Sequence, residues 1–161
     1  MSGNWYILCT KPRAEKKVQS ILRTWHVLNV MPTYVKVRKV QRRTVKTDIP
    51  IFPGYLMARL DAEKRLNIIK TNLTTAVLPL QNARAVLRQL HQLVKAAMQT
   101  EEFRLVVPTG TGDAVRIVNG PMKGIEGRVK TVEGKTLLTV NVEAFGGAVE
   151  VQVSPEDCIA A

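Results

Sequence analysis

Histidine, cysteine and paired carboxylates are the side chains that most often carry catalysis, and this chain offers few of them. His26 and His91 are its two histidines, and neither stands beside a serine or cysteine nucleophile motif. No HExxH sequence, phosphate-binding loop or zinc-type spacing of cysteine and histidine occurs. We therefore expect no enzyme activity, no cofactor and no metal.

The chain is instead rich in cationic side chains, which bind phosphates. Its net charge is +11 over 161 residues. Residues 1–98 hold 18 Lys and Arg against 4 Asp and Glu, a net charge of +14, whereas residues 99–161 hold 6 against 9, a net charge of −3. This distribution predicts two units with different partners, the first facing a polyanion. The alternative is a basic surface that serves only solubility.

Two groups of cations stand out in the basic half. The first lies at the start of a predicted helix, where it either neutralises phosphates or forms a solvated helix face. It comprises Lys11, Arg13, Lys16 and Lys17. The second lies on a predicted hairpin and comprises Lys36, Arg38, Lys39, Arg42, Arg43 and Lys46.

The elements that position these side chains alternate between strands and helices. An apolar run near the N-terminus predicts a buried strand, and Thr10 is expected to cap the next helix, with Pro12 in its first turn. Asp61 and Asn82 are the expected caps of two further helices. The order strand, helix, two strands, helix, strand, helix over residues 1–98 predicts an α+β sandwich, ferredoxin-like in character.

The rest of the chain has a different pattern. Residues 99–111 lose the helical period and are expected to form a linker. Residues 112–161 alternate apolar and polar side chains, which predicts several short strands. About fifty residues with four or five such strands favour a small closed barrel, because closure hides the strand edges.

A glycine-rich stretch opens this second unit. Between Gly112 and Val129, an alternating strand runs into Asn119-Gly120-Pro121, and a basic tip with three glycines leads to a second alternating strand. We expect each glycine where a tight loop needs positive φ or where backbones approach closely. The pattern resembles the KOW motif, a hairpin found in small barrels of transcription and ribosomal proteins.

Three features in order resemble the NusG family of bacterial transcription elongation factors. They are Trp5-Tyr6-Ile7-Leu8, then Phe52-Pro53-Gly54-Tyr55, then the KOW hairpin, and together they extend from about residue 4 to residue 159. The resemblance implies an N-terminal NusG domain over residues 1–98 that binds the clamp helices of RNA polymerase, across the DNA channel from the gate loop. It also implies an SH3-like KOW barrel on a flexible linker that recruits a second factor. Such a factor suppresses pausing or termination.

The resemblance also assigns residues to the polymerase contact. They are Trp5, Tyr6, Phe52, Pro53, Tyr55 and Met57. We expect some of them, not all, to touch the clamp helices, and Trp5 and Phe52 have an alternative place in the core. Because Tyr55 and Leu56 alternate along a strand, one of them faces inward and the other outward.

Nucleic acid is the implied partner of the basic residues. In the family, the start of the first helix lies near the upstream DNA and the non-template strand, which makes Lys11, Arg13, Lys16 and Lys17 candidate contacts. The hairpin, including Arg42 and Arg43, is expected to reach either nucleic acid or an acidic polymerase surface, and the sequence leaves both open.

The implied partner of the KOW domain is Rho or a ribosomal small-subunit protein. The matching loop residues are Ile125, Ala144, Phe145 and Gly147, with Phe145 either an exposed anchor or a plug of the barrel. Ala144 and Gly147 replace the larger aliphatic and basic residues usual in NusG. These departures disfavour Rho and favour a specialised, RfaH-like antiterminator paralog.

Two rival classes remain: a KOW-type RNA-binding protein of the ribosome or its maturation, and a basic nuclease-like enzyme. No apolar run of transmembrane length and no signal peptide is visible, so we expect a cytoplasmic monomer without a membrane partner. Cys9 and Cys158 are expected to be buried, reduced thiols.

Overall fold

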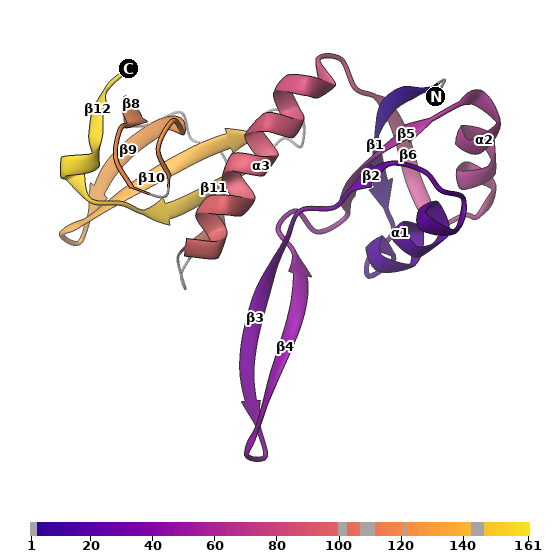
Figure 1. Cartoon of the computed structure of the whole chain (residues 1–161), viewed down its shortest axis with the longest axis horizontal. Coiled ribbons are helices and arrows are strands. Elements are labelled where there is room, and N and C mark those ends of the chain that lie inside the picture. The colour runs from indigo at the N-terminus through magenta and orange to yellow at the C-terminus, as the bar shows by residue number, and fades with distance from the viewer. Residues whose placement is uncertain (1–2, 100–102, 107–111, 121, 143–146) are drawn as a thin grey trace. The chain divides into compact units, whose positions relative to one another are not determined.

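The computed structural model describes residues 3–99, 103–106, 112–120, 122–142 and 147–161. The chain divides into two compact units, Met1–Ala83 and Arg84–Ala161 (Figure 1). Both helices and sheets are present, which confirms the expected α+β class.

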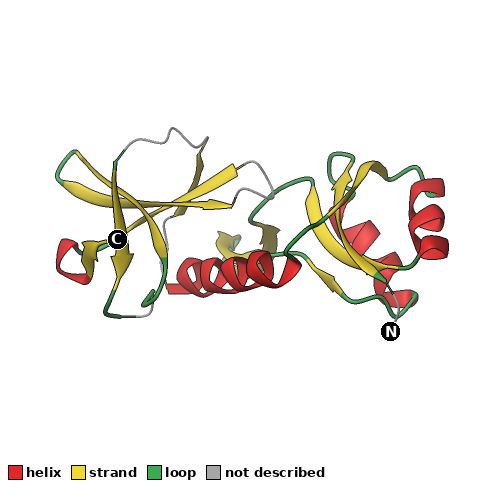
Figure 2. Cartoon of the chain, turned by 90° about the horizontal axis from the view of Figure 1, so that it is seen from above, coloured by secondary structure: helices red, strands yellow, loops and turns green. Residues whose placement is uncertain are grey.

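A four-stranded antiparallel sheet forms the N-terminal unit, in the order β2-β5-β1-β6. Its strands are β1 (Asn4–Thr10), β2 (Asn29–Val30), β5 (Tyr55–Leu60) and β6 (Thr74–Pro79). The helices are α1 (Glu15–Thr24) and α2 (Ala62–Lys70), and Figure 2 shows them in red beside the sheet. Apolar residues recur on one side of each helix, and these sides cover a single face of the sheet.

The core of this unit lies between the sheet and the helices. Val18 and Leu22 of α1 and Ile68 of α2 are fully buried against Leu8 and Leu56 of the central strands. The Asp61 side chain accepts a hydrogen bond from the Lys64 backbone N–H at 2.8 Å, so the predicted N-cap of α2 is confirmed.

A separate two-stranded ribbon extends from the N-terminal unit (Figure 1). It consists of β3 (Thr33–Val40) and β4 (Arg43–Pro50). Gln41 and Arg42 form the tip, and both have positive φ, 46° and 68°, which matches the twist of a two-residue hairpin turn. Residues 41–47 are mostly polar and basic, yet the structure continues β4 through most of this segment because its residues pair with β3.

The second unit contains one long helix and a six-stranded antiparallel sheet. The helix is α3 (Ala83–Gln99), and the sheet order is β12-β8-β9-β10-β11-β7. The strands are β7 (Phe103–Val106), β8 (Asp113–Ile117), β9 (Glu126–Val132), β10 (Lys135–Val142), β11 (Gly147–Gln152) and β12 (Cys158–Ala160). A 3-10 turn at Pro155–Asp157 precedes β12. Pairing between the two outer strands does not occur among the described residues, so barrel closure stays a prediction.

Two features of this unit differ from the expected domain boundaries. Helix α3 groups with the C-terminal sheet, whereas the sequence places it in a domain of residues 1–98. Strand β7 pairs with β11 inside the segment 99–111, which the sequence treats as a linker. Amphipathic periodicity shows that a helix has an apolar side, but it does not identify the sheet that this side covers.

The glycines of the KOW-like stretch behave as their positions predict. A Cβ on Gly127 would lie 2.4 Å from the Thr139 carbonyl oxygen, so β9 and β10 need this residue to have no side chain. Gly112 has φ of 101°, and a Cβ there would lie 2.6 Å from the Val129 carbonyl oxygen.

Candidate functional site

The two central strands of the N-terminal sheet divide their side chains between two faces. Register pairs Tyr55 with Cys9 and Met57 with Ile7, and directly paired residues of antiparallel strands lie on the same face. The neighbouring positions, including Leu8 and Leu56, belong to the core under α1 and α2. Tyr55 therefore lies on the opposite face from those helices, as its alternation with Leu56 predicts.

A hollow of about 660 Å³ lies where Tyr55 begins β5. Its wall comes from the end of β1, the turn before α1, the base of β4, the turn before β5 and the start of β6. The lining residues are Cys9, Thr10, Pro12, Arg13, Glu15, Ile49, Pro50, Pro53, Gly54, Tyr55 and Thr75. Proline, isoleucine, cysteine and the tyrosine ring dominate this wall, and Arg13 and Glu15 supply its two ionisable side chains of opposite charge.

The turn that carries Pro53 and Tyr55 is fixed from both sides of Gly54. The Gly54 N–H donates to Glu15 Oε1 at 2.7 Å, and its carbonyl oxygen accepts from the Thr10 N–H at 2.8 Å. Gly54 has φ of 86°, a conformation that favours glycine. These bonds join the first turn of α1, the end of β1 and the start of β5, and so hold the floor of the hollow in place.

Glu15 is the residue that sequence reasoning missed. Its side chain belongs to the first residue of α1, yet the residue is only 8% exposed, because it turns toward the Gly54 backbone. A carboxylate near a helix N-terminus is also stabilised by the helix dipole. The one available signal is an acidic side chain between Arg13 and Lys16 in a strongly basic segment.

The six residues expected at the polymerase contact do not lie together in the structure. Pro53 and Tyr55 line the hollow, with Pro53 exposed and Tyr55 half-buried. Phe52 is 5% exposed and Met57 0%, so both side chains lie in the interior, which for Phe52 is the alternative that the sequence left open.

The two remaining residues of this set are half-buried elsewhere on the sheet. Tyr6 packs against the core under α1 and α2, and the Arg65 guanidinium carbon lies 5.5 Å from the centre of its ring. Trp5 pairs with Arg59 on β5, on the same face as Tyr55. Neither residue lines the hollow.

Cys9 lies in the hollow as a free thiol, and Cys158 is also free. Burial raises the pKa of the Cys9 thiol. Burial also raises the pKa of Cys158, and the neighbouring Asp157 carboxylate adds to the effect. A raised pKa keeps both groups protonated, and the protonated thiol is a poor nucleophile.

Cations border the hollow on the side of α1. Arg13 lines it directly, and Lys16 and Lys17 are exposed on the first turns of the helix. Lys11 is half-buried, and its backbone N–H donates to the Leu73 carbonyl oxygen at 2.9 Å. The structure thus brings Arg13 to the hollow and leaves Lys16 and Lys17 exposed on α1.

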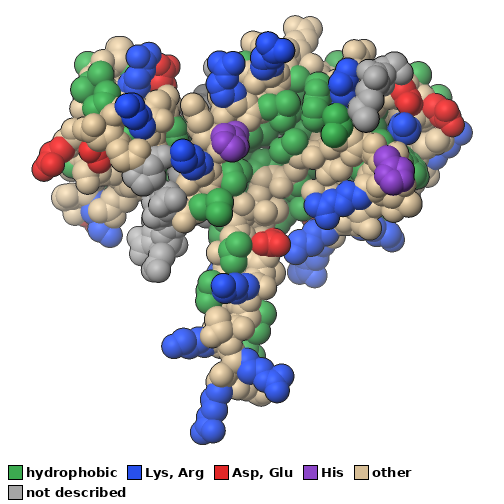
Figure 3. All heavy atoms as spheres, viewed as in Figure 1, with side chains coloured by type: hydrophobic (Ala, Val, Ile, Leu, Met, Phe, Trp, Pro, Cys, Tyr) green, Lys and Arg blue, Asp and Glu red, His purple; other side chains and the backbone are tan. Residues whose placement is uncertain are grey.

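All six cations of the β3–β4 ribbon are exposed. Figure 3 shows Lys and Arg side chains in blue along the ribbon and at its tip. Asp48 is the one acidic residue of the ribbon. Within the part of the chain that the structure describes, none of the six cations forms an ion pair.

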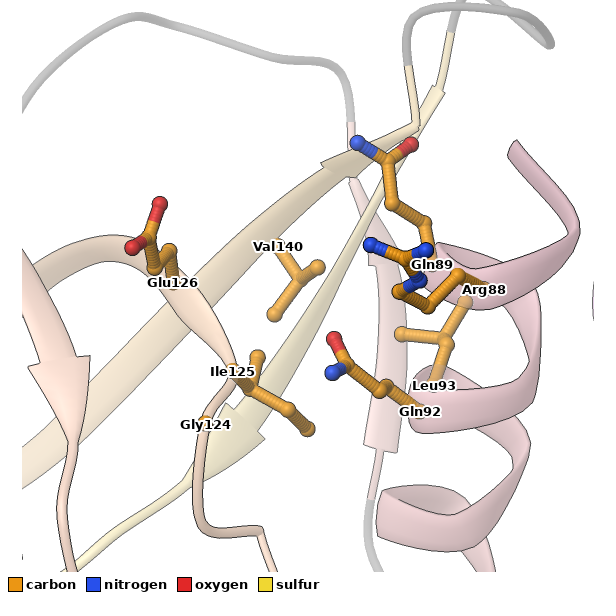
Figure 4. Close-up of a pocket in the computed structure, with 8 residues that line it drawn as sticks. All are labelled: Arg88, Gln89, Gln92, Leu93, Gly124, Ile125, Glu126 and Val140. Atoms are coloured by element: carbon orange, nitrogen blue, oxygen red, sulfur yellow. The ribbon is translucent and has the colours of Figure 1, made fainter. Parts of the chain in front are cut away.

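A second, smaller hollow of about 290 Å³ lies in the C-terminal unit (Figure 4). Leu93 and Gln92 of α3 form one wall, and Gly124, Ile125 and Val140 form another. Ile125 is 3% exposed, so this expected partner contact lies beside α3 rather than on an open surface. Gly147 begins β11, whereas Ala144 and Phe145 lie outside the described residues.

The described segments show neither a metal-binding cluster nor a helix that could span a membrane. No group of three histidine, cysteine or acidic side chains there is arranged to hold a metal ion. None of the described helices combines the length and the apolar character needed to span a bilayer.

Comparison with known families gives one match. A family model described as "Transcription termination factor nusG" matches residues 3–107. A search of curated proteins finds no match.

Proposed function

Since the chain belongs to the NusG family of transcription factors, which bind RNA polymerase, we propose that it is an elongation and antitermination factor that suppresses pausing or termination. Its hollow beside Tyr55 receives the clamp helices of the polymerase. The factor forms and breaks no covalent bond, and it acts by holding the polymerase in its elongating state.

The observation that carries this proposal is the apolar hollow with a fixed floor. Partly exposed tyrosine and proline side chains, set on a turn held by two hydrogen bonds, make a preorganised surface for an apolar partner. A helix pair that inserts a hydrophobic side chain there loses little conformational entropy, because the receiving backbone is already ordered.

Nucleic acid is the second partner that we propose. Lys11, Arg13, Lys16 and Lys17 face the upstream or non-template DNA, together with Arg42 and Arg43 at the ribbon tip. Binding through such residues releases counterions, so the DNA contribution weakens as salt rises.

The C-terminal unit is proposed to be a KOW domain that recruits a second factor, either a ribosomal small-subunit protein or Rho. Ala144 and Gly147 favour a specialised, RfaH-like paralog over a housekeeping factor. The glycines that permit the β9–β10 approach and the turn at Gly112 support the KOW assignment.

The test measures binding of the full chain to core RNA polymerase. Tyr55→Ala is expected to weaken binding by about 1–3 kcal/mol, roughly 5- to 150-fold in Kd. The control is Leu66→Ala, which removes a 54%-exposed side chain from α2, on the other face of the sheet. Equal affinities for the two variants would remove the hollow from the interface, and capture of ribosomal subunits without polymerase would favour the ribosomal alternative.

A further inference from the structure

From Val35 to Asp48, the β3–β4 ribbon exposes both of its faces. Val35 is 53% exposed, Val37 56%, Val40 52% and Val45 45%. A two-stranded hairpin without a core to cover it is marginally stable in water. Exposed aliphatic side chains interleaved with cations therefore indicate a surface shaped for a partner rather than for packing.

The two faces of the ribbon carry different chemistry. Register pairs Lys36 with Thr47, Arg38 with Val45, and Val40 with Arg43, so these six side chains share one face. We call it the arginine face. It carries three cations, two valines and a threonine, and no acid.

The opposite face is the mixed face. It is formed by the pairs Val35 with Asp48, Val37 with Lys46, and Lys39 with Thr44. Asp48 lies on this face, where its carboxylate would repel a phosphate backbone. The arginine face therefore attracts a polyanion more strongly than the mixed face.

We propose that the arginine face enters the major groove of double-stranded DNA. The major groove is about 12 Å wide and admits a two-stranded ribbon, whereas the undistorted minor groove is only about 6 Å wide. Arg38 and Arg43 present bidentate donors suited to the guanine O6 and N7 atoms. Val40 and Val45 on the same face supply apolar contacts for thymine methyl groups.

The same geometry disfavours other nucleic acids. The major groove of an A-form RNA duplex is deep and narrow, so side chains on a ribbon cannot read it. Single strands are held mainly by stacking on aromatic rings. The exposed residues 35–48 of the ribbon contain none, and the one aromatic residue of the ribbon, Tyr34, is half-buried at its base. The inference rests on the proposed function, because a factor at the upstream edge of the polymerase meets duplex DNA.

The test uses the full chain and a fluorescent 20-base-pair DNA duplex of mixed sequence, with fluorescence anisotropy as the readout. Arg38→Ala with Arg43→Ala removes two charges from the arginine face. Lys39→Ala with Lys46→Ala removes two charges from the mixed face and is the matched control. The first pair is expected to weaken duplex binding at least tenfold, and the second pair less than threefold at the same salt concentration.

A charge-conserving variant separates recognition of base edges in the groove from electrostatic attraction to the DNA phosphates. Arg38→Lys with Arg43→Lys keeps both charges but loses the bidentate fork. We expect this variant to lose preference among duplexes of different sequence while it keeps the dependence of log Kd on log salt. Duplex RNA and single-stranded DNA of the same sequence are expected to bind the unmodified chain at least tenfold more weakly than duplex DNA.

Three results would overturn the inference: equal losses from the two faces, equal affinity for duplex RNA or single strands, and absence of duplex binding. Binding of the same variants to core polymerase without nucleic acid keeps this failure distinct from failure of the proposed function. If the ribbon variants bind polymerase normally while DNA binding is absent, the ribbon inference alone fails. If duplex binding follows the arginine face while no polymerase binds, the proposed function fails and the ribbon inference stands.

Discussion

Glu15→Ala tests whether a single carboxylate holds the floor of the hollow. In the structure, Glu15 Oε1 accepts the Gly54 N–H at 2.7 Å, and the substitution leaves that N–H without its partner. A hydrogen bond to a charged group contributes roughly 1.5–3 kcal/mol. Because Gly54 is only half-buried and water can replace part of the bond, we expect the free energy of unfolding to fall by about 1–2 kcal/mol.

A matched control removes the effects of charge and of the helix dipole. Glu63→Ala deletes an exposed glutamate from the first turn of α2, with the same change of net charge and a comparable position in its helix. Its effect is expected to stay within about 0.5 kcal/mol. Glu15→Gln keeps an oxygen acceptor without the charge, and we expect its loss of stability to be roughly half that of Glu15→Ala.

Thermal unfolding of the full chain, followed by tryptophan fluorescence, tests the predicted loss of stability. Trp5 and Trp25 are the two tryptophans of the sequence, and both lie in the N-terminal unit. The fluorescence change on unfolding therefore reports this unit alone. For a domain of this size, each kcal/mol shifts the Tm by about 4–8 °C. A Tm for Glu15→Ala equal to that of Glu63→Ala would show that the Glu15 contact does not stabilise the turn.

Three further predictions concern other parts of the chain. Gly127→Ala places a Cβ 2.4 Å from the Thr139 carbonyl oxygen, so β9 and β10 must separate; we expect a loss of about 1–3 kcal/mol, measured by circular dichroism on residues 84–161. The Asp61 pKa is lowered, chiefly by the hydrogen bond from the Lys64 N–H, so its contribution to stability is present above its ordinary pKa of 3.8 and is lost as pH falls through the lowered value. The stability difference between the unmodified chain and Asp61→Asn should therefore shrink in urea melts as pH drops below 4. Because asparagine can still accept the capping hydrogen bond, a constant difference would show that the charge of the Asp61 carboxylate does not contribute to stability. In a Cys158→Ser chain, Cys9 is the one remaining thiol, and its raised pKa should make its alkylation slow at neutral pH. Bound polymerase should slow this alkylation further, because Cys9 lines the hollow. Equal alkylation rates with and without polymerase would place Cys9 outside the interface.

Several helices and strands of the N-terminal unit follow from local patterns, but the start of the first helix does not. The sequence predicts that Thr10 caps the first helix, whereas α1 begins at Glu15 and Thr10 ends β1. The Thr10 N–H is already bonded to the Gly54 carbonyl oxygen, and Arg13 adopts positive φ, 62°, which a helix cannot continue through. A partner 44 positions away fixes this boundary, and local propensity contains no information about it.

In the candidate site as well, some features follow from the local sequence, and others depend on contacts between residues far apart in the chain. The opposite orientations of Tyr55 and Leu56 follow from strand alternation and are confirmed. The Glu15–Gly54 bond joins residues 39 positions apart, and the contribution of Ile49 to the hollow depends on where the ribbon returns to the sheet. Tertiary contacts of this kind arise from the register of whole elements, so composition and periodicity do not reveal them.

Helix α3 of the second unit is another element whose features the local sequence predicts only in part. Its apolar residues repeat at helical spacing, and Val86, Leu90 and Leu93 are buried, as the pattern predicts. The sequence assigns the helix to a domain of residues 1–98, and the family model, which matches residues 3–107, includes it. In the structure, Leu93 and Ile125 line the same hollow of the C-terminal unit. A partner that uses Ile125 must therefore reach a side chain that is 3% exposed and has α3 as its neighbour.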